Sequence, residues 1–160
     1  MSSDYFSLSA ILASQAKVSV LLNADIPNFG RGGEVESEEG VREPSKMEVP
    51  LWLWNSTDGL GAQKGRLASL QAPERYDAAH RDIGKAQAQV VDLHRLGPHY
   101  IRHGLELLRP HTPHSRPIAE SLLHLFGERA GWVLDRATQG RDQQPPPNLD
   151  RLELRIFQLA

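Results

Sequence analysis

The stretch from residue 90 to residue 104 combines a helical pattern with a helix breaker, and no other part of the chain constrains the fold as much. Its apolar residues, continued to residue 108, recur at the spacing of one helical face: Leu93, Leu96, Tyr100, Ile101, Leu105 and Leu108. Gly97 and Pro98 interrupt this pattern. Proline inside a helix removes a backbone donor and clashes with the preceding turn, which costs roughly 3 kcal/mol. We therefore expect a kinked helix, held by tertiary packing, that continues to about Arg109.

Two glycines mark one side of this helix. Gly97 and Gly104 lie about two helical turns apart, so their faces nearly coincide. Two missing side chains on one face allow another backbone to come close. The pattern predicts a packing surface, directed either at this chain's own helices or at a neighbouring subunit, and nothing on it indicates catalysis.

Composition allows a folded core and excludes several kinds of site. The chain has 160 residues, of which 39% are hydrophobic, and a formal net charge of −2. This length fits one compact domain or two small ones, and the charge provides no global attraction to nucleic acid. The absence of cysteine excludes disulfides and thiolate metal sites. No apolar run approaches the roughly 20 residues of a membrane span, and no signal peptide is evident, so we expect a soluble intracellular protein without membrane contact.

The first half of the sequence predicts a small β-rich unit with one helix. Residues 5–13 predict a short helix capped by Ser7 or Ser9, and residues 17–22 predict a half-buried strand. Residues 30–45 contain four glycines and five glutamates, which favours a mobile acidic loop.

Residues 46–54 give the strongest strand signal in the sequence. Pro50 restricts this strand to an edge or a bulge, because proline cannot donate to the ladder. Trp52 and Trp54 fall on one strand face, which indicates a covering element or a partner. A short strand over residues 67–72 closes the unit.

From Pro73 onward the pattern is helical. We expect helices over residues 74–89, over the stretch that contains Gly97, and from a cap at Ser115 to about Thr138. Asn148 is expected to cap a last helix. Its apolar residues follow the spacing of a helical seam: Leu149, Leu152, Ile156 and Leu159.

These patterns predict an α+β fold with two units. A small N-terminal β-rich domain would occupy residues 1–72, and a C-terminal helical bundle domain would occupy residues 73–160.

Histidines offer one alternative function, that of a small His-dependent metalloprotein. His99 and His103 are four residues apart and could share a helical face, as metal ligands do. The glutamate of the zinc-protease motif is absent between them, and no carboxylate is placed as an obvious third ligand. Surface or capping roles are therefore favoured.

Tryptophans offer another alternative, a single-strand DNA-binding module. Trp52, Trp54 and Trp132 could stack on bases, but no basic surround accompanies them, so packing is favoured. The glycines of residues 59–65 lack the Gly-Lys-Ser/Thr ending of a phosphate loop. We therefore expect no catalytic, cofactor-binding or metal-binding residues, and a protein that is not an enzyme.

Three stretches in order resemble the family of the third subunit of the GINS complex, a eukaryotic DNA replication factor. They are residues 5–15, residues 45–53 around Trp52, and residues 90–100 around Gly97. Each stretch alone is moderately specific, and their order makes the resemblance strong. The resemblance covers about residues 5–138.

The resemblance implies both an architecture and a function. It implies a small B domain followed by a helical A domain, with the break near Pro73. It implies a non-catalytic scaffold subunit in a hetero-tetramer with the three other GINS subunits. In the nucleus that tetramer would join the MCM helicase ring and a DHH-family co-activator, forming the replicative helicase for initiation and elongation. ATP hydrolysis would belong to the ring, and this subunit would meet DNA only indirectly.

The candidate interface residues are apolar or glycine positions on the predicted packing faces. They are Tyr5, Phe6, Trp52, Trp54, Leu93, Gly97, Tyr100, Ile101, Gly104, Leu122, Phe126, Leu149, Leu152 and Ile156. If Gly104 lies at an interface, Gly104→Leu should harm assembly more than Arg102→Ala, because it fills the notched face.

Overall fold

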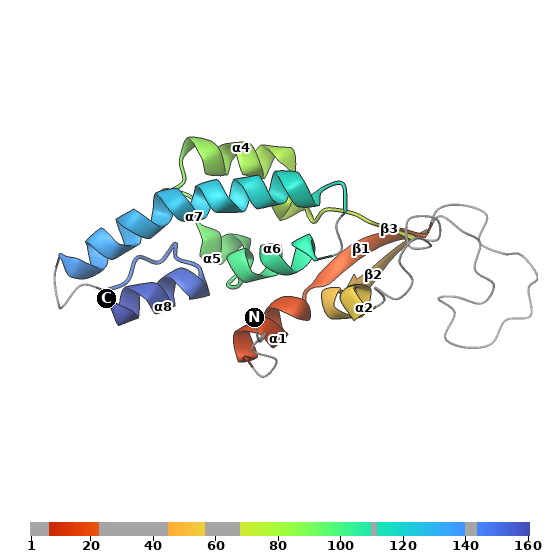
Figure 1. Cartoon of the computed structure of the whole chain (residues 1–160), viewed down its shortest axis with the longest axis horizontal. Helices are drawn as coiled ribbons and strands as arrows, with labels where there is room; N and C mark the ends of the chain where they lie inside the picture. The colour runs from red at the N-terminus through yellow and green to blue at the C-terminus, as the bar shows by residue number, and fades with distance from the viewer. Residues whose placement is uncertain (1–6, 23–44, 57–67, 110–111, 140–143) are drawn as a thin grey trace, which may run out of the picture.

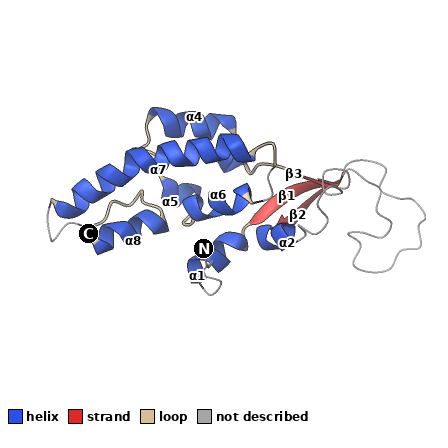
Figure 2. Ribbon diagram, in the orientation of Figure 1, coloured by secondary structure: helices blue, strands red, loops and turns tan. Residues whose placement is uncertain are grey.

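A small antiparallel sheet lies at one end of the molecule and a group of helices lies at the other (Figures 1 and 2). The computed structural model describes residues 7–22, 45–56, 68–109, 112–139 and 144–160. This arrangement confirms the predicted α+β class. Tyr5, Phe6 and nearly all of the predicted acidic loop lie outside the described residues. None of the described helices is long and apolar enough to cross a membrane.

The sheet has three strands in the order β2-β1-β3. They are β1 (Lys17–Leu22), β2 (Ser45–Pro50) and β3 (Ala68–Leu70), and α1 (Leu8–Ser14) precedes them. In β1, Val18 pairs with Val49, and Val20 pairs with Met47 on one side and Leu70 on the other. Val18 and Val20 are buried, as the alternating pattern of this strand predicts.

The predicted strand over residues 46–54 is wrong beyond Pro50, where the chain turns into α2 (Leu51–Ser56). The Leu-Trp-Leu-Trp run has neither helical nor strand periodicity, so it fits both structures. Proline ends the strand, and the backbone N–H of Leu51 donates to the carbonyl oxygen of Ala16 at 3.0 Å. The two tryptophans therefore do not share a face: Trp54 is buried and Trp52 is exposed.

The second half of the chain contains a short 3-10 helix and five α-helices among its described residues. They are η2 (Glu74–Tyr76), α4 (Ala78–Ala86), α5 (Leu93–Leu96), α6 (Tyr100–Leu108), α7 (Ser115–Thr138) and α8 (Arg151–Leu159). The long helix α7 runs along the group, with α4 on one side and α6 and α8 on the other (Figure 1). Every one of these three shorter helices packs against α7.

The helix expected across Gly97 is broken rather than kinked. Helix α5 ends at Leu96 and α6 begins at Tyr100. Gly97 has φ = 153°, a backbone conformation that side-chain-bearing residues rarely adopt. Pro98 follows it without a backbone donor. The dipeptide thus acts as a corner that redirects the chain.

Several helix starts differ from the prediction, and aspartates cap two of these helices. The Asp77 carboxylate accepts from the backbone N–H of His80 at 2.8 Å, so α4 begins after η2 rather than at Glu74. Asp150, not Asn148, caps α8. Ser115 is the first residue of α7 and not its cap.

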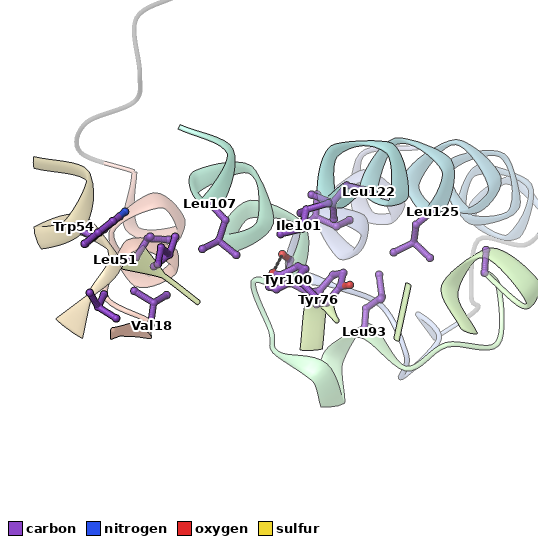
Figure 3. Packing of buried hydrophobic residues seen from close by; sticks show 14 residues of the cluster. Val18, Leu51, Trp54, Tyr76, Leu93, Tyr100, Ile101, Leu107, Leu122 and Leu125 are labelled. Carbon is purple, nitrogen blue, oxygen red and sulfur yellow. Dashed lines mark hydrogen bonds between the residues drawn. The ribbon is translucent and has the colours of Figure 1, made fainter. Parts of the chain in front are cut away.

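A single cluster of buried apolar residues joins the sheet to the helices (Figure 3). Val18, Leu51 and Trp54 lie together at the sheet end, and Leu107 of α6 lies between them and the helical part. There the buried apolar side chains include Tyr76, Leu93, Tyr100, Ile101, Leu122 and Leu125. Helix α1 also packs against α6, so the first and second halves of the chain are in direct contact.

Candidate assembly surface

The glycines expected to form a notch are filled by side chains of the same chain. A Cβ atom on Gly104 would lie 2.6 Å from Leu122 Cδ1 and 3.1 Å from Tyr76 Cε1, which is too close without a shift. A Cβ atom on Gly97 would lie 3.0 Å from Nη1 of Arg75. The predicted packing surface is therefore occupied by this chain's own α7 and η2.

The His103 ring is buried, and neighbouring side chains engage both of its nitrogens. Nδ1 lies 3.1 Å from the Tyr76 hydroxyl oxygen, and Nη2 of Arg75 lies 3.2 Å from both ring nitrogens. Since the Tyr76 hydroxyl donates to the Tyr100 carbonyl oxygen at 2.6 Å, the ring donates from Nδ1 and accepts from Arg75 at Nε2. Burial, and then the charge of Arg75, lowers the pKa of His103 to about 3. The ring is therefore neutral at pH 7.

This arrangement weighs against His99 and His103 as a pair of metal ligands. A metal ion on Nε2 of His103 would displace the Arg75 guanidinium and leave two positive charges side by side. His99 precedes the first residue of α6, and burial lowers its pKa. Within the described parts of the chain, no three His, Asp or Glu side chains gather closely enough to hold a metal ion.

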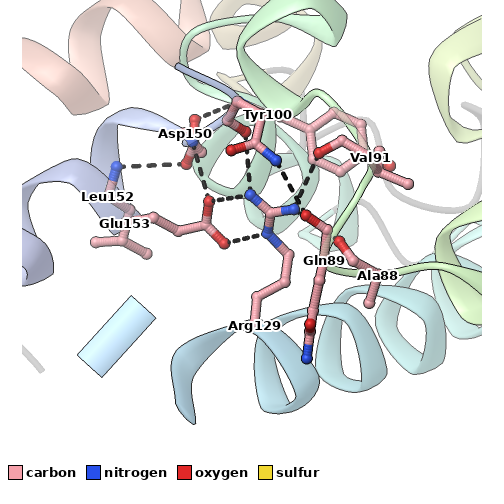
Figure 4. A network of polar contacts seen from close by, with 9 residues as sticks. Ala88, Gln89, Val91, Tyr100, Arg129, Asp150, Leu152 and Glu153 are labelled. Carbon is pink, nitrogen blue, oxygen red and sulfur yellow. Dashed lines mark hydrogen bonds and ion pairs between the residues drawn. The ribbon is translucent and has the colours of Figure 1, made fainter. Parts of the chain in front are cut away.

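Arg129 of α7 is fully buried, and all five of its N–H groups have acceptors (Figure 4). Nε and Nη2 form two parallel bonds to the Glu153 carboxylate, at 2.6 and 2.9 Å. Nη1 donates to the carbonyl oxygens of Ala88 and Val91 at 2.7 and 2.9 Å. Nη2 also donates to the carbonyl oxygen of Asn148 at 3.0 Å. One side chain thus holds α8 and the turn before α5 against α7.

Asp150 caps two helices with one buried carboxylate. Oδ1 accepts from the backbone N–H of Tyr100, the first residue of α6, at 3.1 Å, and Oδ2 accepts from that of Leu152 at 3.4 Å. Glu153 completes a capping box by accepting from the backbone N–H of Asp150 at 3.0 Å. Burial raises the pKa of Asp150 to about 6, although these N–H groups lower it. The carboxylate ties the start of α6 to the start of α8.

Sequence reasoning missed these three charged residues, although part of the signal was present. Arg129 lies on the apolar stripe of α7, four residues from both Leu125 and Val133, where a charge indicates a buried partner. Asp150 and Glu153 have the spacing of a capping box. The pairing of Glu153 with Arg129 left no local signal, because the two residues lie on different helices.

Helix α1 has its apolar face turned outward. Leu8, Ile11 and Leu12 lie on one side of the helix and expose 69%, 39% and 45% of their surface. Ala13, on the opposite side, is buried. A helix that packs through small residues and exposes large apolar ones leaves surface that water solvates poorly. Another protein surface would cover it favourably.

Helix α2 adds to this exposed apolar surface. Trp52 exposes 50% of its surface and Leu53 exposes 40%, whereas Leu51 and Trp54 are buried. Neither α1 nor α2 contains a charged residue, and the backbone hydrogen bond from Leu51 to Ala16 links the start of α2 to the turn that follows α1. Two uncharged helices with exposed large side chains are typical of a protein interaction site.

The helical end exposes apolar residues too. Leu123 and Leu134 of α7 are exposed, as are Leu152 and Leu159 of α8, while Ile156 is half-buried. Of the four residues in the seam predicted for the last helix, the described residues thus leave Leu152 and Leu159 exposed, whereas Leu149 is buried.

The structure divides the candidate interface residues by their exposure. Seven are buried: Trp54, Leu93, Tyr100, Ile101, Gly104, Leu122 and Leu149. Three are half-buried: Gly97, Phe126 and Ile156. Trp52 and Leu152 are exposed, and Tyr5 and Phe6 lie outside the described residues. Contacts between these residues and another chain remain predictions.

Comparison with known proteins identifies the family. Residues 6–56 match the model of the PSF3 N-terminal domain. The chain is 33% identical to the DNA replication complex GINS protein PSF3 of Bos taurus, over 97% of this chain and 74% of the relative. It is 34% identical to that of Xenopus laevis, over 96% and 73% of the two chains. The chain belongs to the PSF3 family of GINS proteins. A fungal PSF3 from Phaeosphaeria nodorum is 28% identical over 99% of this chain and 90% of the relative.

Membership in the PSF3 family confirms the resemblance found in the sequence. The matched N-terminal domain includes α1, β1, β2 and α2, and so contains both uncharged exposed helices. The matches to whole PSF3 proteins extend over the helical half as well.

Proposed function

We propose that this chain is a non-catalytic scaffold subunit of a GINS hetero-tetramer and acts in the nucleus in DNA replication. Its relatives are named as DNA replication complex proteins, which supports assembly with the three other GINS subunits. By the same proposal the tetramer joins the MCM helicase ring and a DHH-family co-activator, in initiation and elongation. DNA contact is indirect, through the assembly.

The outward apolar face of α1 carries this proposal. Leu8, Ile11 and Leu12 expose large apolar surface on a helix without charge, and Trp52 adds to it from α2. Such surface is stabilised by a partner that removes it from water, at about 25 cal/mol per Å² of apolar area.

The buried charges support a role without catalysis. Arg129, Glu153 and Asp150 are committed to helix ends and loop carbonyls, and the His103 ring has no free nitrogen. These side chains position helices instead of facing a substrate.

The division of the chain is part of the proposal. We propose that residues 1–72 form the B-type domain and residues 73–160 the A-type domain of the subunit. The change from sheet to helices at Pro73 supports this boundary.

Co-expression with the other three GINS subunits tests the proposal. The wild-type chain should enter a 1:1:1:1 particle that survives size-exclusion chromatography, with its composition read by native mass spectrometry. Leu12→Glu should reduce its incorporation severalfold, because it places a charge on the apolar face of α1. Gln15→Glu adds the same charge at an exposed polar position beside α1 and should incorporate normally. A wild-type chain that remains a monomer beside the three subunits would contradict the proposal.

A further inference from the structure

Four arginines lie around the corner between α5 and α6. Arg75 of η2 contacts the corner from one side, because its Nη1 donates to the carbonyl oxygen of Leu96 at 3.4 Å. The start of α8 lies beside the corner (Figure 1), and the backbone N–H of Arg151 donates to the carbonyl oxygen of Pro98 at 3.0 Å. We call the following four residues the basic corner: Arg75, Arg95, Arg102 and Arg151.

His99 lies between these arginines along the chain and shows how close one of the charges is. Burial, and then the charge of Arg151, lowers the pKa of His99, so Arg151 is within electrostatic reach of the ring. Arg102 follows His99 by three residues on α6, and Arg95 precedes it by four residues in the last turn of α5. Arg95 and Arg151 are exposed, whereas Arg75 and Arg102 are half-buried. The basic corner is therefore open to solvent in part.

The basic corner has no acidic partner among the described residues. None of its four arginines forms an ion pair there, whereas Arg109 and Arg116 each pair with a glutamate at 2.9 Å. The exposed carboxylate nearest in sequence to Arg95 is that of Asp92, which caps α5 by accepting from the backbone N–H of Arg95 at 2.9 Å. The positive charges are thus left without a counter-charge.

Arg75 is the least satisfied of these side chains. Its Nε is buried and has no hydrogen-bond partner among the described residues. Its remaining contacts are long, at 3.4 Å to Leu96 and 3.2 Å to the ring nitrogens of neutral His103. Arg129, by contrast, makes five hydrogen bonds of 2.6 to 3.0 Å, two of them to a carboxylate. A guanidinium withdrawn from water without strong acceptors is unfavourable, so Arg75 lacks the carboxylate that Arg129 has.

We propose that the basic corner binds an acidic segment of a protein outside the GINS complex, with one carboxylate on Arg75 and others on Arg95 and Arg151. A guanidinium can offer a carboxylate two parallel hydrogen bonds, which an ammonium group cannot. Gly97 leaves room for the Arg75 guanidinium, because a Cβ atom there would lie 3.0 Å from Nη1. This contact goes beyond the proposed function, since it concerns a partner of the assembled subunit.

The surroundings of the basic corner favour an acidic protein segment over nucleic acid. Tyr76 and Tyr100, whose rings lie beside Arg75, are buried, so bases would have no tyrosine to stack on. The net charge of −2 gives no long-range attraction to a polyanion such as DNA. A short acidic segment needs only the local charges.

Charge also distinguishes this site from a permanent subunit contact. The centres of stable protein interfaces are depleted of charged residues, whereas the basic corner has four unpaired arginines. These arginines come from four different elements, which are η2, α5, α6 and α8. An extended segment can follow side chains that are distributed in this way.

Fluorescence anisotropy tests the proposal. The full-length chain, alone and within the co-expressed four-subunit complex, is titrated into a short labelled peptide rich in glutamate. The same peptide with glutamine in place of glutamate is the control. The glutamate peptide should bind in both cases, with an affinity that falls as salt is raised, and the glutamine peptide should not bind.

Matched variants assign the binding to the basic corner. Arg95→Gln/Arg151→Gln removes two exposed charges, so the chain stays folded, and should weaken binding severalfold. Lys85→Gln/Arg136→Gln removes the same charge from exposed positions of α4 and α7 and should stay within twofold of wild type. Arg75→Gln should weaken binding about tenfold, and Arg75→Lys should recover only part of the affinity. The melting midpoint shows whether the Arg75 variants are folded.

Several outcomes would overturn the proposal. They are equal binding of the glutamate and glutamine peptides, and unchanged binding by Arg95→Gln/Arg151→Gln. Tighter binding of single-stranded DNA than of the glutamate peptide would overturn it as well, because the ligand is then nucleic acid. Binding by the chain alone that disappears in the complex would also do so, since the basic corner then faces another subunit.

The two conditions keep this proposal separate from the proposed function. A chain that binds the glutamate peptide but never enters a complex defeats the scaffold role and leaves the anion site standing. A complex that assembles normally and ignores the peptide has the opposite meaning.

Discussion

Arg129 holds a full positive charge where water has no access, and each of its N–H groups has an acceptor. A buried pair of this kind is expensive to break, because removing one member leaves the other charge buried. Arg129→Met should therefore lower the free energy of unfolding by roughly 3–5 kcal/mol. Arg129→Lys should recover little of this free energy, because an ammonium group cannot form two parallel hydrogen bonds to the Glu153 carboxylate.

Chemical denaturation monitored by circular dichroism measures this effect. Arg136→Met is the matched control, because Arg136 is an exposed arginine on the same helix. Its effect should stay within about 0.5 kcal/mol. Similar losses in Arg129→Met and Arg136→Met would mean that the buried network contributes nothing beyond helix propensity.

Asp150 should make the free energy of unfolding depend on pH, with a sign opposite to that of an ordinary salt-bridged carboxylate. Burial raises its pKa from 3.8 to about 6, so the folded chain holds this proton more tightly than the unfolded chain. The contribution to stability is therefore full below about pH 4 and is lost as the pH rises through about 6. A shift of this size corresponds to up to about 3 kcal/mol.

Asp150→Asn isolates the titration, because asparagine does not titrate between pH 4 and pH 7. Its single side-chain oxygen can replace only one of the two capping oxygens, so the loss of the other cap lowers stability by an amount that does not depend on pH. The difference in unfolding free energy between Asp150→Asn and wild type should change by up to about 3 kcal/mol between pH 4 and pH 7, in favour of the variant at pH 7. A difference that stays constant over that range would show that the carboxyl has an ordinary pKa.

Among the helices, Gly104 and Gly127 predict opposite effects of the same substitution. Gly104→Ala places a Cβ 2.6 Å from Leu122 at the junction of α6 and α7, and should destabilise the chain by roughly 1–3 kcal/mol. Gly127→Ala enters open space on α7 and should stabilise the chain by up to about 1 kcal/mol. Thermal melting should show a lower midpoint for the first variant and a higher one, by about 2–4 °C, for the second. Shifts of the same sign would contradict the packing described for Gly104.

The elements that local pattern specifies were predictable, and those that depend on distant contacts were not. The alternation in residues 17–22 predicted β1 correctly. Gly97 and Pro98 marked an interruption, but the pattern predicted a kinked helix where the structure has two separate helices. The run from Leu51 to Trp54 has no period, so its helix depends on contacts such as the hydrogen bond to Ala16. Gly104 was rightly taken as a close-packing position, but only the structure identifies α7 as its neighbour.

The candidate assembly surface, too, could be predicted from the sequence only in part. The sequence pointed to Trp52 and to the seam at Leu152, and both residues are exposed. The outward turn of Leu8 and Leu12 could not be predicted, because an amphipathic helix normally buries its apolar face. The outward orientation of these residues follows from the packing of α1 on α6, a contact that the local sequence pattern does not specify.

On the scale of the whole molecule, exposed apolar side chains at both ends predict poor behaviour of the isolated chain. We expect the chain alone to self-associate as its concentration rises, since water solvates α1, α2 and the outer side of α7 unfavourably. Leu8→Glu/Leu12→Glu should reduce the average mass in light scattering without lowering the melting midpoint. A wild-type chain that remains a monomer at high concentration would contradict this expectation.

The bonds of Arg129 also bear on the order in which the chain opens and closes. Its partners lie 41, 38, 24 and 19 residues away along the chain, so its charge is not neutralised until α7, α8 and the turn before α5 have met. Chain ends usually fray and exchange their amide protons quickly. Helix α8, although it lies at the end of this sequence, should exchange as slowly as α7, because the two are released only in one cooperative opening.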